Sequence, residues 1–357
     1  MKILHVSDFH VRLKDDNRYK TALVQAIQYI LFLTKEHKPD YVVIAGDLFD
    51  TKHPTMSEFA LATAFLKGLL AHTKVILVAG NHDEPANEGS HNTLQPLANL
   101  KIPGLYICEE PGLFNVDGLD ILAMPYIYQE RDACRAYIKK LHDEYTGDNL
   151  FLIAHAWVPG YANMICQDTE FFLSTEYLNS LTKVKHGFLG HIHLAGCAAP
   201  RMYYSGSPFR VDWGETEPIK SVYMWEDGKL MAYEVPSMPL VVCTYPDIPK
   251  DCTAKSMIKI LAHGLPLDQL GTLEQTKKSL EDLGHVVKID LELRGIKFDT
   301  INPEKKELGF VEFFDEYMSS NDLLADKAVY LDLCTKIINE QVTKDSSPFD
   351  LFKEELK

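Results

Sequence analysis

The sequence predicts an α/β fold in which buried strands alternate with amphipathic helices. Two observations lead to this prediction. First, short β-branched apolar runs, such as residues 41–44, alternate with helical patterns through the first part of the chain, as they do in proteins with parallel sheets. Second, aspartate and histidine side chains follow directly after several of these runs. Open α/β sheets place their functional sites at these carboxyl ends of strands.

The first three strands and the two helices between them follow from hydrophobic spacing and helix-stop signals. Apolar residues at helical spacing predict an amphipathic helix that Pro39 stops. Ser57, followed by Glu58, is a candidate N-cap for the second helix. The expected elements are a strand at residues 2–7, a helix at 17–38, a strand at 41–44, a helix at 59–71 and a strand at 74–79.

Two Asp-Gly pairs predict β-hairpins, because this dipeptide suits the tight turn between antiparallel strands. Asp117-Gly118 lies between strands expected at residues 112–116 and 119–124, and Asp227-Gly228 between strands expected at 221–225 and 229–235. The segments between the hairpins are predicted to contain a helix at residues 129–145 and strands at 150–154, 185–189 and 202–204.

Four prolines between residues 236 and 249 mark a change in composition, as expected at a boundary between domains. We therefore expect a first domain at residues 1–235 and a small α+β domain at residues 236–300. The smaller domain is predicted to contain a helix at 254–262 and a strand at 286–294. Residues 301–357 are predicted to form C-terminal helices at 308–318 and 322–342.

The net charge of −15 argues against a protein that holds nucleic acid over a wide basic face. It does not exclude a metal-dependent enzyme that acts on DNA, because clustered acidic ligands add to the count and bound cations reverse the local sign.

Seven cysteines without a C-x-x-C pair leave at least one thiol unpaired, which favours a reducing, cytoplasmic location. The apolar runs are shorter than a membrane span, and the first residues pass directly into a strand. We expect neither a membrane segment nor a cleavable signal.

Candidate metal ligands follow five predicted strands. Carboxylate and amide oxygens mixed with imidazoles, without a thiolate, suit Mn²⁺, with Fe or Zn²⁺ possible. Asp47 follows Gly46 at the end of a buried strand, where a carboxylate can bridge two cations and generate a nucleophilic water. That chemistry is phosphoester hydrolysis. The candidate residues are Asp8, His10, Asp47, Asp50, Asn81, His82, His155, His191 and His193.

In order along the chain, these residues form the motifs D-x-H, G-D-x-x-D, G-N-H-D, H and G-H-x-H. The pattern resembles the calcineurin-like metallophosphoesterase superfamily as far as residue 235, and implies a mixed β-sandwich flanked by helices. By the resemblance, Asp8, His10, Asp47 and His193 would hold one metal, and Asp47, Asn81, His155 and His191 the other. His82 would be catalytic, oriented by a hydrogen bond that it donates to Asp50.

Within this superfamily, the chain is most similar to the nuclease subunit of SbcCD-type complexes. Pro54 after the G-D-x-x-D motif, the stretch at residues 204–208 with Trp213-Gly214-Glu215 beyond it, and the order of domains carry this similarity. It implies a Mn²⁺-dependent DNA exonuclease and endonuclease that works with a coiled-coil ATPase in DNA end processing, repair or recombination. It also implies a capping domain at residues 236–300 and a homodimer through residues 59–70 and the segment after Asn92.

Four further side chains are candidates for contact with substrate phosphates, although arginines and surface histidines are more often simply solvated. They are Arg12, His53, Arg201 and Arg210. The C-terminal helices resemble in position the segment that binds the ATPase, and carry Phe310, Phe313, Phe314 and Tyr317 at roughly helical spacing.

Two alternative functions remain open. One is a phosphomonoesterase or cyclic-nucleotide phosphodiesterase of the same superfamily, which would need no capping domain. The other is a non-catalytic adaptor that recruits the ATPase. The chemically intact motif positions speak against the adaptor.

Overall fold

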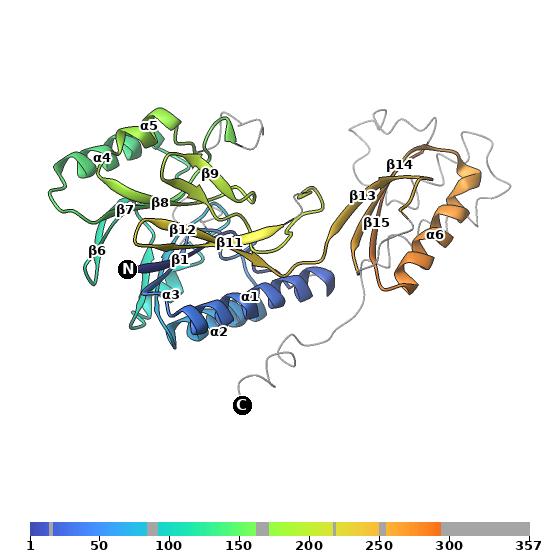
Figure 1. Ribbon diagram of the computed structural model, residues 1–357, viewed down its shortest axis with the longest axis horizontal. Helices are drawn as coiled ribbons and strands as arrows, with labels where there is room; N and C mark the ends of the chain where they lie inside the picture. The colour runs from blue at the N-terminus through green and yellow to red at the C-terminus, as the bar shows by residue number, and fades with distance from the viewer. Residues whose placement is uncertain (14–16, 84–91, 162–170, 217–218, 250–254, 294–357) are drawn as a thin grey trace. The chain divides into compact units, whose positions relative to one another are not determined.

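The computed structural model describes residues 1–13, 17–83, 92–161, 171–216, 219–249 and 255–293 of the chain (Figure 1). These residues divide into two compact units. Of the described residues, those within 1–13, 18–241 and 255–257 belong to the first unit, and those within 17, 242–249 and 258–293 belong to the second. The division therefore falls within the proline-containing stretch 236–249.

The first sheet of the larger unit has six strands in the order β12-β11-β1-β2-β3-β4. Its four parallel strands are β1 to β4, and the first three are rich in buried Val, Ile and Leu, as expected for strands covered on both faces. The β11–β12 hairpin pairs antiparallel with β1 at one side. The strands are β1 (Lys2–Val6), β2 (Tyr41–Ile44), β3 (Lys74–Val78), β4 (Leu105–Cys108), β11 (Lys220–Glu226) and β12 (Lys229–Val235).

The second sheet also has six strands, in the order β5-β6-β7-β8-β10-β9. Strands β6, β7, β8 and β10 are parallel, while β5 and β9 pair antiparallel at the two edges. The strands are β5 (Gly112–Val116), β6 (Leu119–Met124), β7 (Leu150–His155), β8 (Val184–Gly190), β9 (Gly196–Ala199) and β10 (Met202–Tyr204).

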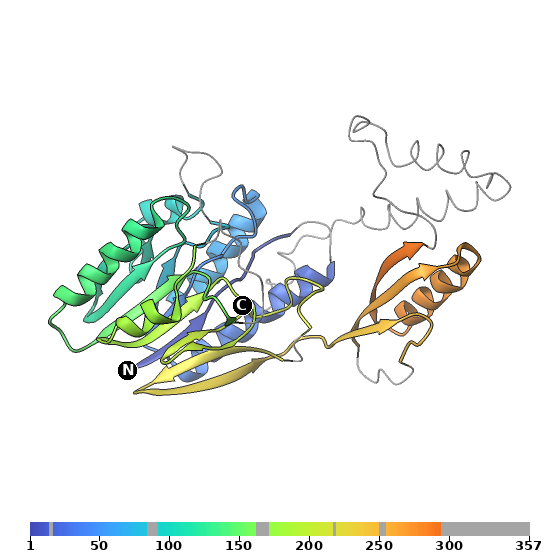
Figure 2. The ribbon, with the colours of Figure 1, turned by 90° about the horizontal axis from the view of Figure 1, so that it is seen from above.

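The inner faces of the two sheets share one hydrophobic core, in which Ile3, Val43 and Ile76 of the first sheet pack with Ile121 and Phe151 of the second. Helices cover the outer faces (Figures 1 and 2), so the unit is the predicted mixed β-sandwich flanked by helices. The helices are α1 (Asn17–His37), α2 (Met56–Leu70), α3 (Gln95–Asn99), α4 (Arg131–Glu144) and α5 (Thr175–Ser180).

Helix α2 begins earlier than its predicted N-cap at Ser57. Thr55 caps it instead, because the Thr55 hydroxyl accepts the Glu58 N–H while the Glu58 carboxylate accepts the Thr55 N–H. This reciprocal capping box satisfies two helix-end donors at once, which Ser57 could not do.

The smaller unit contains a three-stranded sheet in the order β13-β14-β15 and the helix α6 (Leu270–Asp282), preceded by the short 3₁₀ turn η2 (Leu267–Gln269). The strand β15 (Val286–Leu293) was predicted, whereas β13 (Leu240–Thr244) and α6 were not. The predicted helix at 254–262 is wrong. That segment enters β14 (Met257–Leu265), in which buried Ile258, Ile260 and Ala262 alternate with less buried neighbours.

The helices predicted at residues 308–318 and 322–342, with Phe310, Phe313, Phe314 and Tyr317, lie outside the described residues. In the described part of the chain, the helices are each too short or too polar to cross a membrane.

Candidate metal centre

The carboxyl ends of β1, β2 and β3 in one sheet and of β7 and β8 in the other bring the predicted residues together. Four of these residues have a positive φ angle, a conformation that is rare for residues other than glycine. The angles are 54° for Asp8, 44° for His10, 50° for Asp47 and 100° for His191. Backbone strain of this kind persists where the surrounding structure enforces it, and it concentrates at functional sites.

Two glycines allow the strand ends to approach one another closely. A Cβ atom on Gly80 would collide with the carboxylate and backbone nitrogen of Asp47. A Cβ atom on Gly190 would collide with the backbone carbonyl of Ala45. The motif glycines are therefore required by the close contact between loops, and any side chain there would displace a candidate ligand.

Asp47 lies at the centre of the site. Its Oδ2 atom is 3.5 Å from Nε2 of His10 and 3.4 Å from Nε2 of His155, and its Oδ1 atom accepts the backbone N–H of His82 at 2.9 Å. Burial opposes ionisation of this carboxyl, but the neighbouring histidines outweigh burial and lower its pKa. One carboxylate thus faces imidazoles from both sheets, as a bridging ligand would.

On one side of Asp47, an amide and two imidazoles converge. The Oδ1 atom of Asn81 lies 3.0 Å from Nε2 of His155 and 2.9 Å from Nδ1 of His191. The opposite nitrogen of His155, Nδ1, is 2.8 Å from the Ala45 carbonyl oxygen and must donate to it. This hydrogen bond fixes the tautomer and leaves the Nε2 lone pair directed at Asp47 and Asn81.

On the other side, Asp8, His10 and His193 converge. Nε2 of His10 is 3.0 Å from Nε2 of His193. The Asp8 carboxylate accepts the Ser7 hydroxyl at 2.5 Å and the His191 backbone N–H at 3.0 Å. These bonds hold the carboxylate beside the two imidazoles.

The donor set fits cations. Three groups of three side chains each bring their ligand atoms within 4.8 Å of one another: Asp8, His10 and His193; His10, Asp47 and His82; and Asp8, Asp47 and His155. Lone pairs of buried oxygens and nitrogens that face one another repel unless a positive charge lies among them. Burial disfavours protonated His155, yet the attraction of Asp47 prevails and raises the His155 pKa to about 9. The site therefore attracts positive charge.

The sequence predicted no role for Glu215 or Lys220, yet both support the candidate ligand His193. Nδ1 of His193 donates to Oε1 of Glu215 at 2.8 Å, and the other oxygen of Glu215 is paired with the buried Lys220 ammonium. That ammonium also donates to the Ser207 hydroxyl at 2.9 Å and the His193 carbonyl at 3.1 Å. The only sequence signal was the position of Glu215 in the Trp-Gly-Glu stretch.

The Asp83 carboxylate holds two loops of the site together. This buried carboxylate accepts the backbone N–H groups of Gly80 at 3.0 Å, Phe49 at 3.1 Å and Leu48 at 3.3 Å. Burial, with the nearby charge of Asp47, raises the Asp83 pKa to about 7. Asp83 thereby joins the loop of Asp47 to the loop of Asn81 and His82.

The expected hydrogen bond between the Asp50 carboxylate and His82 is not formed. Nδ1 of His82 is instead 2.7 Å from the backbone carbonyl oxygen of Asp50. The Asp50 carboxylate turns the other way, with Oδ1 3.3 Å from Nδ1 of His10 and Oδ2 3.0 Å from the Arg12 guanidinium. Asp50 orients His82 through the main chain and contacts His10 through its side chain.

The four candidate substrate contacts differ in position. His53 is exposed on the loop after Asp50, whereas Arg12 is half-buried against Asp50, with its guanidinium 4.3 Å from the centroid of the Tyr19 ring. Arg210 is buried and donates to backbone and hydroxyl oxygens, so it has a structural role. Arg201 bonds the carbonyl of Val184 at the start of β8, the end of that strand opposite to His191. A contact of Arg201 or Arg210 with DNA stays a prediction.

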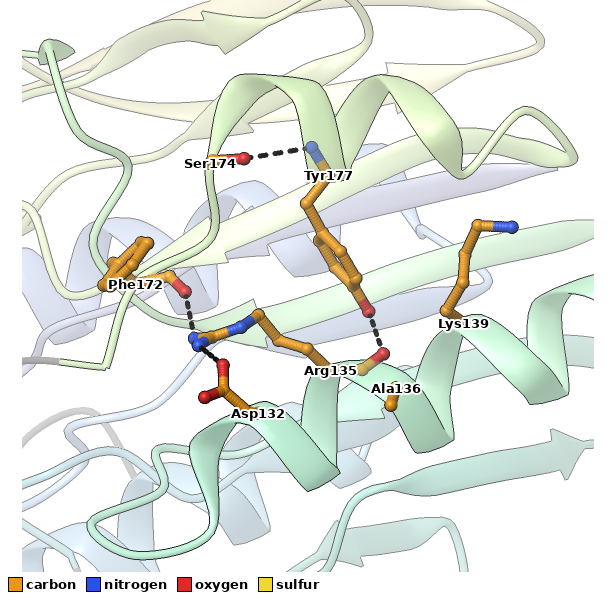
Figure 3. A pocket seen from close by; sticks show the side chains of 7 residues that line it. All are labelled: Asp132, Arg135, Ala136, Lys139, Phe172, Ser174 and Tyr177. Carbon is orange, nitrogen blue, oxygen red and sulfur yellow. Dashed lines mark hydrogen bonds and ion pairs between the residues drawn. The ribbon is translucent and has the colours of Figure 1, made fainter.

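A separate surface pocket of about 330 Å³ lies between α4 and the segment that leads into α5 (Figure 3). The Arg135 guanidinium is paired with Asp132 and donates to the Phe172 carbonyl, while Lys139 is paired with Asp143. Tyr177 donates to the Arg135 carbonyl at 2.9 Å. The cations of this pocket are paired with neighbouring carboxylates. Its lining residues include none of the candidate metal ligands.

The chain is similar to several known proteins. The SbcD subunit of the nuclease SbcCD from Escherichia coli strain K12 is 23% identical over 275 residues, which cover 67% of this chain and 69% of the relative. The same protein of strain O157:H7 matches with the same figures. Among solved structures, TT1561 of Thermus thermophilus matches with a TM-score of 0.44 and 16% identity, over 66% of this chain and 99% of that one.

A model of the calcineurin-like phosphoesterase family matches residues 1–195, which are more than half of the chain and include every predicted metal ligand. The chain therefore belongs to the calcineurin-like phosphoesterase family, hydrolases that act on phosphoesters at a dinuclear metal centre.

Proposed function

We propose that this protein is a metal-dependent phosphodiesterase that cleaves DNA as an exonuclease and endonuclease. The single observation that carries the proposal is the position of Asp47, whose carboxylate faces His10 on one side and His155 on the other. The similarity to a protein named as part of a nuclease supports DNA as the substrate.

In this proposal, two metal ions share Asp47. Asp8, His10 and His193 complete one ligand set, and Asn81, His155 and His191 complete the other. When bound, the ions would supply a water of lowered pKa and neutralise charge on the phosphate. The mixed oxygen and imidazole ligands favour Mn²⁺, with Fe or Zn²⁺ as alternatives.

His82 has a different role from the ligands in this proposal. Its Nδ1 atom donates to the Asp50 carbonyl, which orients the ring and leaves Nε2 to exchange a proton with substrate. We assign His82 as the proton donor to the leaving oxygen of the phosphodiester, with Asp50 as the residue that positions it.

We further propose that the protein works with a coiled-coil ATPase in DNA end processing, repair or recombination. Residues 236–300 would form the capping domain and residues 301–357 the segment that docks on the ATPase. The named role of the Escherichia coli relative as one component of a complex supports a partner. A cytoplasmic location is supported by Cys108, Cys134 and Cys197, which form no disulfide.

A homodimer is also part of the proposal. Its expected surface included residues 59–70, but Leu61, Phe65 and Leu66 of that segment are buried within the chain. Met56 at the start of α2 is 82% exposed and Leu100 after α3 is 65% exposed, and these are the apolar side chains we assign to the dimer surface. Sedimentation of the wild type against Met56→Glu tests this assignment.

The purified chain with Mn²⁺ should cleave linear DNA faster than it hydrolyses p-nitrophenyl phosphate. Asp47→Ala should abolish both activities while the far-ultraviolet circular dichroism is retained, because the ligand lies outside the strand core. Preference for p-nitrophenyl phosphate or for a cyclic nucleotide would mean that the protein is a phosphomonoesterase or a cyclic-nucleotide phosphodiesterase rather than a nuclease. Hydrolysis of none of these substrates, together with retained ATPase binding, would identify a non-catalytic adaptor.

A further inference from the structure

Tyr128 is an exposed aromatic side chain attached to the candidate metal centre. Its hydroxyl donates to the backbone carbonyl of Asn81 at 3.0 Å, and 44% of the residue remains exposed. Its ring packs edge-on against Tyr126, with centroids 4.9 Å apart. Tyr126 is buried and packs against the His191 ring at 5.6 Å. The Tyr128 ring is therefore held at the rim of the site by contacts to a ligand backbone and to a buried aromatic.

Lys52 approaches the same ring from a different loop. Its Nζ atom is 4.6 Å from the centroid of the Tyr128 ring. Lys52 follows Asp50, whose carbonyl accepts the hydrogen bond from His82. Tyr128 and Lys52 thus come together from two different loops. The loop of Tyr128 is hydrogen-bonded to the backbone of Asn81, and the loop of Lys52 accepts the hydrogen bond from His82.

An exposed aromatic face beside an ammonium group matches one nucleotide unit, because a base stacks on the ring and a phosphate pairs with the cation. The hydrogen bond of the Tyr128 hydroxyl restricts the motion of its ring, so stacking of a base on the ring costs less conformational entropy. The cation–π contact of Lys52 at an exposed site is weak enough to be exchanged for a phosphate.

We propose that Tyr128 and Lys52 form a nucleotide subsite, in which Tyr128 stacks on the base next to the scissile phosphate and Lys52 pairs with a neighbouring phosphate. The subsite rests on the proposed cleavage of nucleic acid and specifies how the substrate is selected. It assigns to these residues binding of nucleotides in general, since base stacking tolerates any base.

Two phosphodiesters that release the same leaving group test the stacking contact. The p-nitrophenyl phosphodiesters of thymidine, at its 5′ or 3′ oxygen, carry a base, whereas methyl p-nitrophenyl phosphate does not. In Tyr128→Leu, the ratio of kcat/KM for the better thymidine ester to that for the methyl ester should fall about tenfold, through KM. Tyr128→Phe keeps the ring and should keep most of this ratio. Tyr137→Leu, at a tyrosine of α4 that is 48% exposed, is the matched control and should leave the ratio at its wild-type value.

The salt dependence of oligonucleotide binding tests the phosphate contact. Lys52→Met should weaken binding and reduce the slope of log affinity against log salt concentration by about one, as for loss of one phosphate contact. Lys140→Met, at an exposed lysine of α4, should leave the slope unchanged.

The outcomes separate the subsite from the proposed function. Equal losses on the thymidine and methyl esters in Tyr128→Leu would show that the tyrosine only positions Asn81, and would overturn the subsite. An unchanged salt slope in Lys52→Met would remove Lys52 from it. A wild-type protein that hydrolyses p-nitrophenyl phosphate but neither diester would instead overturn the nuclease function on which the subsite rests.

Discussion

The Nδ1 atom of His193 lies 2.8 Å from the Oε1 atom of Glu215, whose second oxygen is paired with the buried ammonium of Lys220. Burial would favour the neutral carboxylic acid, but the hydrogen bond from His193 and the charge of Lys220 hold the Glu215 pKa at about 2. Glu215 therefore stays ionised near neutral pH. It keeps the proton of His193 on Nδ1 and the lone pair of Nε2 directed at the candidate metal centre.

Glu215→Gln should lower metal affinity by about 10–100-fold, the usual effect of losing the hydrogen-bonded partner of a ligand histidine. Calorimetric titration of the metal-free protein with Mn²⁺ measures the change in metal affinity. Glu226→Gln, at a carboxylate of β11 paired with Lys2 on the surface, is the control and should bind Mn²⁺ like the wild type. Equal affinity in the Glu215 variant would show that His193 needs no such partner.

His82→Ala should retain the metals but lower kcat by about 10²–10⁴-fold, because a positioned proton donor is lost while the assigned ligands remain. Mass spectrometry checks the metal content of the variant, and steady-state kinetics on DNA check its kcat. Loss of a metal in this variant would make His82 a ligand instead.

Asp50→Asn should leave the position of His82 unchanged, because Nδ1 of His82 donates to the main-chain carbonyl of Asp50 rather than to its side chain. Its effect should be felt at His10, whose Nδ1 atom is 3.3 Å from the Asp50 carboxylate. We expect weaker Mn²⁺ binding but a near-normal kcat at saturating Mn²⁺. A large fall in kcat that excess Mn²⁺ does not restore would refute this assignment.

Two buried histidines away from the metal centre should make the fold sensitive to acid. Burial lowers the pKa of His5 to about 3 and that of His186 to about 4, from an ordinary value of 6.5. Below pH 6.5 these two histidines therefore bind protons in the unfolded chain but not in the folded chain, so their contribution to stability falls as pH falls. Between pH 7.5 and pH 5, each histidine should cost about 2 kcal/mol.

Urea unfolding with a chelator present measures this loss without a contribution from bound metal. His186→Phe should remove the contribution of His186, a difference from the wild type of about 2 kcal/mol between the two pH values, whereas His72→Gln, at an exposed histidine, should behave like the wild type. The comparison with the wild type is needed because Asp83 and His155, whose pKa values are raised, stabilise the fold as pH falls. A His186→Phe variant with the pH dependence of the wild type would mean that His186 does not titrate as described.

The strands that carry the site could be predicted because strands buried on both faces are rich in β-branched residues, as in Tyr41–Ile44. The polar residues after these strands meet because parallel strands align their carboxyl ends. The sequence could not predict whether a residue acts through its side chain or through its backbone. Asp50 reaches His82 through its carbonyl, and this depends on the loop backbone rather than on the type of side chain.

Other features could not be predicted because they depend on contacts made in the folded chain. Arg210 donates to backbone oxygens of Glu215 and Met238, and its contact with DNA stays a prediction. Glu215 contacts His193, which lies 22 residues earlier in the chain. In β14, the segment at 257–265 pairs within a sheet, and this tertiary context overrides its helical pattern.

The last prediction concerns residues 301–357, which lie outside the described residues and carry apolar side chains at helical spacing, among them Phe310, Phe313 and Phe314. Two short amphipathic helices cannot bury all of these side chains against each other, so the remainder should dock in a groove or on a coiled coil of another chain. Truncation after Gly295 removes these helices and keeps every assigned metal ligand. We expect the truncated protein to retain Mn²⁺-dependent cleavage of single-stranded DNA, and to lose both ATP-stimulated cleavage and co-purification with the coiled-coil ATPase of its own organism. A full-length Phe313→Glu variant should show the same separation, which guards against misfolding of the truncated chain. Unchanged affinity for the ATPase in both proteins would place the docking surface elsewhere in the chain.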